Sequence, residues 1–213
     1  MNKLGYVLGT LVSLSSFTAL AAPTTWDIDP AHSSAGFSVR HMMVSTVRGD
    51  FGKLTGTVTI EGTDWKTAVV DASVDVNTIN TREAKRDGHL KSPDFFDVAK
   101  YPTITFKSTK VDVGAGGAIK LMGNLTMHGV TKPVTFDVQP ISKEYKNPSG
   151  QIVIGTSATT KLDRKAFGLN WNKPVEQAGG VLVGDDVNVT LDLELDKKIP
   201  GGGKVVAPPP ARK

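Results

Sequence analysis

The segment Val187-Asn-Val-Thr-Leu-Asp-Leu-Glu-Leu-Asp196 alternates an apolar with a polar side chain along its whole length. Successive side chains of a β-strand point to opposite faces, so this segment predicts a strand with one apolar and one solvated face. The pattern recurs along the chain and predicts about eight strands. The other seven contain the apolar stripes of residues 35–39, 54–60, 68–76, 104–106, 119–125, 134–138 and 152–158.

Strands that are apolar on one face only have to close around a common interior. A closed barrel removes the edge strands, and eight strands enclose enough space for one small ligand. A two-sheet sandwich would show the same alternation and is the alternative. Small residues at inward positions favour an open interior, namely Ala68, Ala72, Gly56, Gly123 and Ala158. The prediction is an all-β fold, a single eight-stranded antiparallel barrel with an apolar internal channel.

The alternation stops between residues 77 and 101. The segment Asn80-Thr-Arg-Glu83 fits a capping box, with Asn80 as the N-cap and Glu83 at N3, and predicts a short helix over residues 81–89. A Ser-Pro pair then predicts a helical turn over residues 92–96. We expect this helical insertion, about 80–98, to cover an opening of the barrel.

The first 21 residues have the features of a secretory signal peptide. Lys3 precedes a mostly apolar run, and Ala19-Leu-Ala21 is a small-x-small cleavage site. We therefore expect an exported, soluble, periplasmic protein with its barrel domain over residues 22–198. The Gly- and Pro-rich residues 199–213 are expected to form a disordered tail. Since no second long apolar run follows, no transmembrane segment is expected.

Composition argues against several classes of function. The chain has no cysteine, which removes thiol catalysis and thiolate metal sites. The formal net charge is +4, but the basic residues are scattered among acidic ones. Because no Arg-rich run with interleaved aromatic residues occurs, nucleic acid is not an expected partner.

The polar residues do not form a recognisable catalytic or metal motif. The four histidines include no H-x-H or H-x-x-x-H pair, so neither a metal site nor another cofactor is expected. A hydrolase built from Ser33, His89 and Asp94 lacks a G-x-S-x-G elbow and conflicts with the β alternation. The pair Asp185-Asp186 is interpreted as a solvated turn before the last strand. No catalytic residues are predicted.

Arg86 and His89 are the candidates for binding a polar head group. Cationic side chains near a barrel mouth can hold a phosphate by charge-assisted hydrogen bonds. In the alternative, which we favour slightly, Arg86 and Asp87 form internal salt bridges that fix the insertion to the barrel. Phe95 and Phe96 are expected to pack the insertion onto the barrel or to line the cavity.

Several polar segments resemble, in order, the hallmark segments of the YceI-like family of periplasmic proteins. Those of the N-terminal half are Trp26-Asp-Ile-Asp-Pro-Ala-His-Ser33, Phe37-Ser-Val-Arg-His41, Gly49-Asp-Phe51, Asn80-Thr81 and Arg86-Asp-Gly-His-Leu-Lys-Ser-Pro-Asp-Phe-Phe-Asp97. Those that follow are Tyr101-Pro-Thr-Ile-Thr-Phe-Lys-Ser108, Gly123-Asn-Leu-Thr-Met-His-Gly-Val-Thr-Lys-Pro-Val134 and Leu162-Asp-Arg-Lys-Ala-Phe-Gly168. Together they cover nearly all of residues 25–195.

The resemblance implies a lipocalin-like barrel that binds a polyisoprenoid, an isoprenoid quinone or another long-chain lipid, and is compatible with a homodimer. It carries over no catalytic residues. Alternation places the predicted contacts with the lipid tail at Phe37, Val39, Phe51, Val70, Val74, Ile104, Phe106, Leu121 and Phe136. Two alternatives stay open: an enzyme that acts on such a lipid, and a stress-response or interaction protein whose barrel is filled.

Overall fold

The structure is a computed structural model that describes residues 22–175 and 180–198. The predicted signal peptide and C-terminal tail therefore lie outside the described residues. The strands are β1 Pro23–Ile28, β2 Ser34–His41, β3 Ser45–Phe51, β4 Leu54–Glu61, β5 Asp64–Asp75, β6 Ile79–Asn80, β7 Thr103–Val113, β8 Ile119–Met127, β9 Val130–Val138, β10 Tyr145–Lys146, β11 Ile152–Asp163, β12 Pro174–Val175, β13 Gly180–Val181 and β14 Val183–Lys197. The helices are α1 Ala84–Lys91 and the 3-10 turns η1 Val76–Thr78, η2 Ala115–Gly117 and η3 Arg164–Phe167. None of the described helices is long and apolar enough to cross a membrane.

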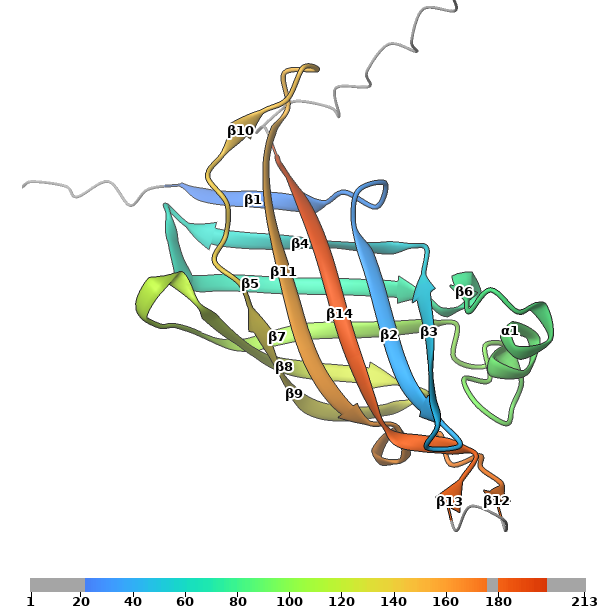
Figure 1. Cartoon of the computed structure of the whole chain (residues 1–213). Coiled ribbons are helices and arrows are strands. Elements are labelled where there is room, and N and C mark those ends of the chain that lie inside the picture. The colour runs from blue at the N-terminus through green and yellow to red at the C-terminus, as the bar shows by residue number, and fades with distance from the viewer. Residues whose placement is uncertain (1–21, 176–179, 199–213) are drawn as a thin grey trace, which may run out of the picture.

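Eight of the strands close into an antiparallel barrel, which confirms the predicted fold class. Neighbouring strands follow the order β11-β9-β8-β7-β5-β4-β1-β14, and β14 pairs with β11 to close the ring. In Figure 1 β1, β4, β5, β7, β8 and β9 run across one wall, and β11, β14 and β2 cross in front of them. The sandwich alternative is wrong, because hydrogen bonds join the two walls at the β9–β11 and β1–β14 edges.

The longest strand, β14, pairs with both β1 and β2, which a short break in the chain separates. Its C-terminal part pairs with β1 and its N-terminal part with β2. At the break, the Ser33 hydroxyl donates to the Glu194 carbonyl over 3.2 Å and accepts from the Glu194 amide over 3.0 Å. The Asp29 carboxylate accepts from the Ala31 amide over 2.8 Å. The polar residues of the Trp26–Ser33 segment thus form a barrel corner, where side chains replace missing ladder bonds.

The same corner makes the stability of the protein depend on pH. The pKa of His32 is raised above its usual 6.5, first by the hydrogen bond to Asp29 and then by the charges of Asp29 and Glu194. Stabilisation from a raised pKa is complete below the unfolded pKa and is lost as the pH rises through the folded pKa. We expect His32→Ala to lower the Tm at about pH 5.5 and to leave it unchanged at about pH 9. Thermal unfolding followed by circular dichroism measures both, and an equal loss at the two pH values would contradict an ionic contribution.

Three details of the sequence analysis need correction. Asn80 is not the N-cap of the helix: α1 begins at Ala84, and the Glu83 side chain caps it by accepting from the amides of Lys85 and Arg86. Asn80 instead accepts from the Arg82 amide in a local turn. Asp185 and Asp186 lie within β14 rather than in a turn before it. The strands β1 and β3, and the two-residue strands β6, β10, β12 and β13, were not predicted.

The small inward residues have two different roles. Ala68, Ala72 and Ala158 line the interior space, as an open barrel requires. Gly123 does not, because the Phe106 ring occupies the volume beside it, and a Cβ atom there would lie 2.4 Å from the ring and from the Lys107 carbonyl. Glycine at this position therefore lets the Phe106 ring pack against β8.

We expect Gly123→Ala to lower the free energy of unfolding by about 1–3 kcal/mol, because it overpacks this contact. The matched control is Gly155→Ala on β11, where a Cβ atom would make only an ordinary 3.6 Å contact. Urea unfolding of the two variants measures the difference. Equal stabilities would show that the Phe106 ring moves aside without cost.

Candidate functional site

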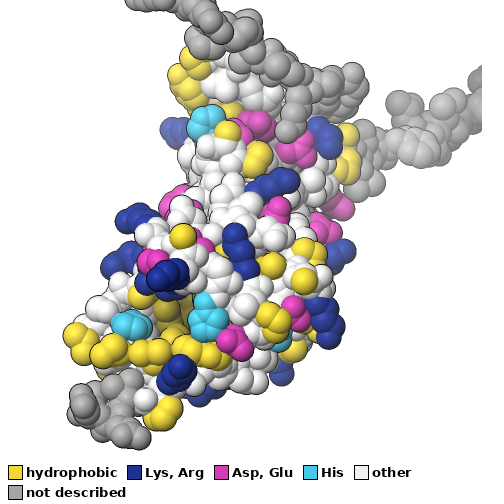
Figure 2. Space-filling view, turned by 90° about the vertical axis from the view of Figure 1, so that its right-hand side faces the viewer, with side chains coloured by type: hydrophobic (Ala, Val, Ile, Leu, Met, Phe, Trp, Pro, Cys, Tyr) yellow, Lys and Arg dark blue, Asp and Glu magenta, His cyan; other side chains and the backbone are white. Residues whose placement is uncertain are grey.

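The barrel encloses an apolar cavity of about 260 Å³ between its two walls. Side chains from all eight strands of the ring line it, with Ile28 as the contribution of β1, and β2 and β3 contribute Phe37, Val39 and Phe51. Figure 2 views the molecule from the side of α1 and shows a hollow with hydrophobic atoms in its depth and histidine side chains on either side. We take this hollow as the mouth of the cavity.

All nine residues predicted from alternation to contact a lipid tail line this cavity. Val70, Val74, Ile104 and Leu121 are only half-buried although they point into the barrel, because the cavity itself leaves surface on them. The Phe106 and Phe136 rings meet edge to face with centroids 5.3 Å apart, and the two rings form part of one wall. Contact between any of these residues and a ligand stays a prediction.

The helical insertion contributes to the lining as well. Leu90 of α1 and the following Phe95 and Phe96 border the cavity. Phe96 meets the Phe51 ring edge to face with centroids 6.0 Å apart, and Phe95 lies 5.1 Å from the Trp171 ring. The insertion therefore connects β3 with the loop after η3, and its aromatic side chains both pack on the barrel and line the cavity.

Arg86 and His89, the predicted head-group residues, do not line the cavity. The Arg86 guanidinium donates to the Thr81 hydroxyl and to the Thr81 carbonyl, each over 2.8 Å. Asp87 accepts from the same hydroxyl and from the Thr81 amide. His89 Nε2 lies 2.7 Å from an Asp94 carboxylate oxygen. Arg86 and Asp87 thus fix the insertion through buried Thr81 and not through the direct ion pair that the sequence analysis considered.

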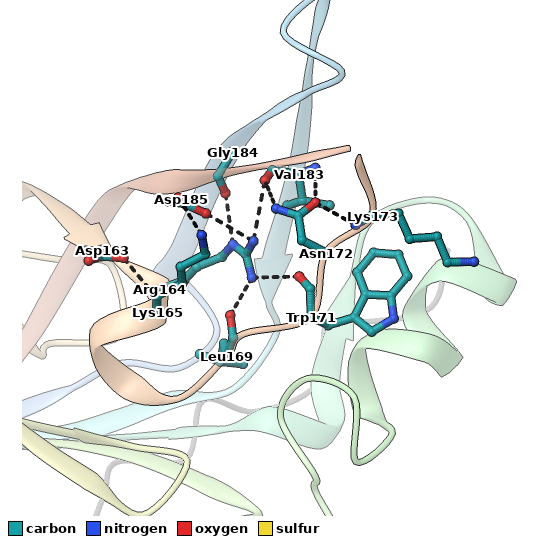
Figure 3. Close-up of polar contacts among 10 residues, drawn as sticks. All are labelled: Asp163, Arg164, Lys165, Leu169, Trp171, Asn172, Lys173, Val183, Gly184 and Asp185. Atoms are coloured by element: carbon teal, nitrogen blue, oxygen red, sulfur yellow. Dashed lines mark hydrogen bonds and ion pairs between the residues drawn. The ribbon is translucent and has the colours of Figure 1, made fainter. Parts of the chain in front are cut away.

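Arg164 is the charged residue among those that line the cavity. Its guanidinium joins two segments at the edge of the cavity, residues 164–173 and 183–185, which we call the rim (Figure 3). It donates to the carbonyls of Gly184 (2.9 Å), Trp171 (2.9 Å) and Leu169, and it pairs with Asp185 over 3.2 Å. The residue is only 5% exposed. Burial lowers the pKa of Arg164 below its usual value, while the charges of Asp185 and Asp163 oppose that shift. A guanidinium nevertheless stays protonated at neutral pH.

The sequence analysis missed the role of this rim. Arg164 stands in the segment Leu162–Gly168, which was noted for its resemblance and not for a site. Trp171 lies seven residues further on, and its ring centroid is 4.7 Å from that of His89. A buried arginine that binds carbonyls leaves no periodic signal in the sequence, so alternation could not reveal it.

Possible metal ligands gather at one place in the described part of the chain. Asp29, His32 and Glu194 each offer one ligand atom, and these atoms lie within 4.8 Å of one another. The group is the barrel corner described above. Its histidine side chain is 65% exposed, and its contacts are explained by the break between β1 and β2. We assign no metal to it.

A closed antiparallel barrel with an apolar cavity inside defines the lipocalin-like class of folds. Within that class, residues 26–195 match the family model of the YceI-like domain. The chain belongs to the YceI-like family. It is 37% identical over 173 residues to UPF0312 proteins of Staphylococcus aureus strains N315 and USA300, covering 81% of this chain and 97% of each relative.

Solved structures agree with this assignment. Burkholderia cenocepacia BcnA superimposes with a TM-score of 0.67 at 20% identity, over 78% of this chain and 98% of BcnA. The Campylobacter jejuni YceI protein gives 0.63 at 27% identity, over 75% and 90%. A polyisoprenoid binding domain from Saccharophagus degradans gives 0.58 at 17% identity, over 84% and 99%. At such identities the first and third of these similarities show the fold alone.

Proposed function

We propose that this protein binds one long-tailed amphiphilic lipid, with the tail inside the barrel. The observation that carries the proposal is the cavity of about 260 Å³, whose described lining is almost wholly apolar. An apolar cavity of about 150 Å³ stays dry and takes up a small apolar molecule, so a larger one of the same character favours apolar occupants over water. The filled barrel, one of the alternatives, receives no support from this geometry.

Burial of the tail would supply the affinity. Each methylene group removed from water contributes about 0.8 kcal/mol, so ten of them contribute about 8 kcal/mol before the cost of association. Specificity for the tail is then a matter of length and branching, since few polar groups face the cavity. An isoprenoid, an isoprenoid quinone and a fatty-acid-like chain all satisfy these conditions.

The proposed role is that of an exported carrier in the periplasm, on the strength of the signal-like sequence of residues 1–21. Binding without catalysis is favoured because the described lining contains one titratable side chain, that of Arg164. Its N–H groups already donate to backbone carbonyls and are therefore not available for acid–base chemistry. Arg86 and His89 remain predicted head-group contacts. Their bonds to Thr81 and Asp94 favour the structural alternative for both.

Native mass spectrometry of protein purified from the periplasm tests the proposal, followed by organic extraction and identification of any bound molecule. We expect a complex with one lipid, and an unliganded protein that takes up an added isoprenoid quinone or polyprenyl phosphate. A lipid-free mass with no uptake of either compound would contradict the proposal.

A further inference from the structure

The turn between β2 and β3 exposes three large apolar side chains. Met42, Met43 and Val44 are 38%, 57% and 78% exposed, and they follow one another in the chain. The other large apolar residues with comparable exposure in the described chain, Val69 and Tyr145, stand singly on other strands. Single exposed apolar residues need no explanation, whereas a contiguous exposed group marks an interaction site.

The backbone of this turn has a conformation that asparagine and glycine adopt more easily than methionine. Met42 and Met43 have positive φ angles of 50° and 59°, and the Val44 amide closes the turn on the His41 carbonyl over 3.0 Å. Positive φ at both central positions characterises a type I′ turn, for which Asn-Gly is the preferred pair. Two methionines at these positions are unfavourable both for the backbone conformation and because their apolar side chains are exposed to water. Departures of this kind from local preference are typical of functional sites.

The turn lies at the rim of the cavity. Val39, three residues before Met42, lines the cavity, so the turn begins on the order of 10 Å along the strand from the lining. The Met42 amide donates to the Leu182 carbonyl over 2.8 Å, and the next residue, Val183, lines the cavity as well. A hydrophobic tail that leaves the mouth on this side therefore passes close to the exposed side chains.

Positive charge accompanies the apolar residues. Residues 40–49 contain Arg40 and Arg48 and no carboxylate. Arg40 donates to the Met43 carbonyl over 2.6 Å and to the Thr46 hydroxyl over 3.1 Å, which keeps its guanidinium beside the turn. Lys173, on the neighbouring loop, extends over the Trp171 ring at 5.9 Å (Figure 3). Apolar side chains with flanking cations match the interface of a bilayer that contains anionic lipids.

We propose that the β2–β3 turn, Met42-Met43-Val44 with Arg40 beside it, inserts into the surface of an anionic lipid bilayer and docks the cavity mouth against it. The inference rests on the proposed function in that docking gives a lipid tail a path from bilayer to cavity. A second copy of this chain is a less suitable occupant, because its own turn would carry the same positive charge.

The test is flotation of unliganded protein with vesicles of phosphatidylcholine and phosphatidylglycerol, which needs no knowledge of the ligand. The variant is Met42→Asn with Met43→Gly. It removes the apolar side chains and installs the pair that the turn prefers, so its Tm should rise by about 2–4 °C. We expect its vesicle-bound fraction to fall at least about tenfold. Val69→Thr, which removes an exposed valine from β5, is the control and should float like the unchanged protein.

Transfer of a fluorescent fatty-acid analogue from protein to vesicles gives the second readout. The variant with Met42→Asn and Met43→Gly should bind the analogue in solution with unchanged affinity and transfer it at least about tenfold more slowly. Equal flotation of variant and unchanged protein, no flotation of either, or self-association of the unchanged protein that the variant abolishes would overturn the inference. Absence of analogue binding in both proteins, with the flotation difference intact, would count against the cavity as the binding site and leave the docking surface standing.

Discussion

Ala68→Phe should weaken lipid binding about 100-fold or more and leave the barrel folded. Ala68 lies on β5 with its methyl group in the cavity. A phenyl ring needs about as much room as benzene, which fills an apolar cavity of about 150 Å³, so the ring would take up more than half of the 260 Å³ available. We expect the affinity for an isoprenoid quinone to fall by a factor of about 100 or more, as measured by fluorescence titration.

The neighbouring residue provides a matched control. Val69 follows Ala68 on the same strand, points to the outer face and is 62% exposed. Val69→Phe adds the same ring outside the barrel and should bind lipid like the unchanged protein. Because the ring in Ala68→Phe fills empty space, its free energy of unfolding should stay equal or rise by about 0.5–2 kcal/mol. Unchanged affinity in a folded Ala68→Phe variant would rule out the cavity as the lipid site.

The contrast between Ala68 and Val69 shows why the barrel could be predicted from the sequence. A strand that is buried on one side alternates strictly, and a register shift of one residue would reverse every side chain. The stripes of β4, β5, β8 and β14 therefore indicate the strands, their inward faces and the residues around the cavity. The volume inside, however, depends on how the inward side chains pack. The Phe106 ring occupies the space beside Gly123, so the prediction that this glycine leaves open space was wrong.

Features held by polar contacts were less predictable. β1 has only Trp26 and Ile28 as an apolar pair, and β3 has a polar centre at Arg48-Gly-Asp50, so neither shows the stripe on which the prediction depended. The place of β1 in the sheet depends on a partner far along the chain, β14, whereas β3 pairs with the adjacent β2 across the turn at Met42 and Met43. At α1 the pattern Asn80–Glu83 fits a capping box, but the Asn80 side chain closes a local turn and Glu83 caps the helix.

The second large expected effect is a loss of thermal stability when the Arg164 guanidinium is removed. Arg164→Met keeps the apolar stem and removes the guanidinium, so the carbonyls of Leu169, Trp171 and Gly184 lose their donor in a buried place. Loss of one partner from a buried charged network costs about 3–5 kcal/mol, more than the apolar stem can recover. For a domain of this size that corresponds to a fall in Tm of about 10 °C, which calorimetry measures.

The adjacent residue separates this effect from loss of a charge. Lys165 also binds Asp185, over 2.9 Å, but its side chain is 42% exposed, so Lys165→Met should cost less than about 1 kcal/mol. Arg164→Lys should fall between the two, because an ammonium group keeps the charge but cannot reach several carbonyls as the planar guanidinium does. In Arg164→Met, amide hydrogen exchange should rise first in residues 164–173 and 183–185, the segments that the guanidinium joins. A uniform rise over the whole barrel, or a Tm equal to that of Lys165→Met, would show that the rim does not depend on Arg164, and apolar packing of Phe167 and Leu169 would then have to hold it.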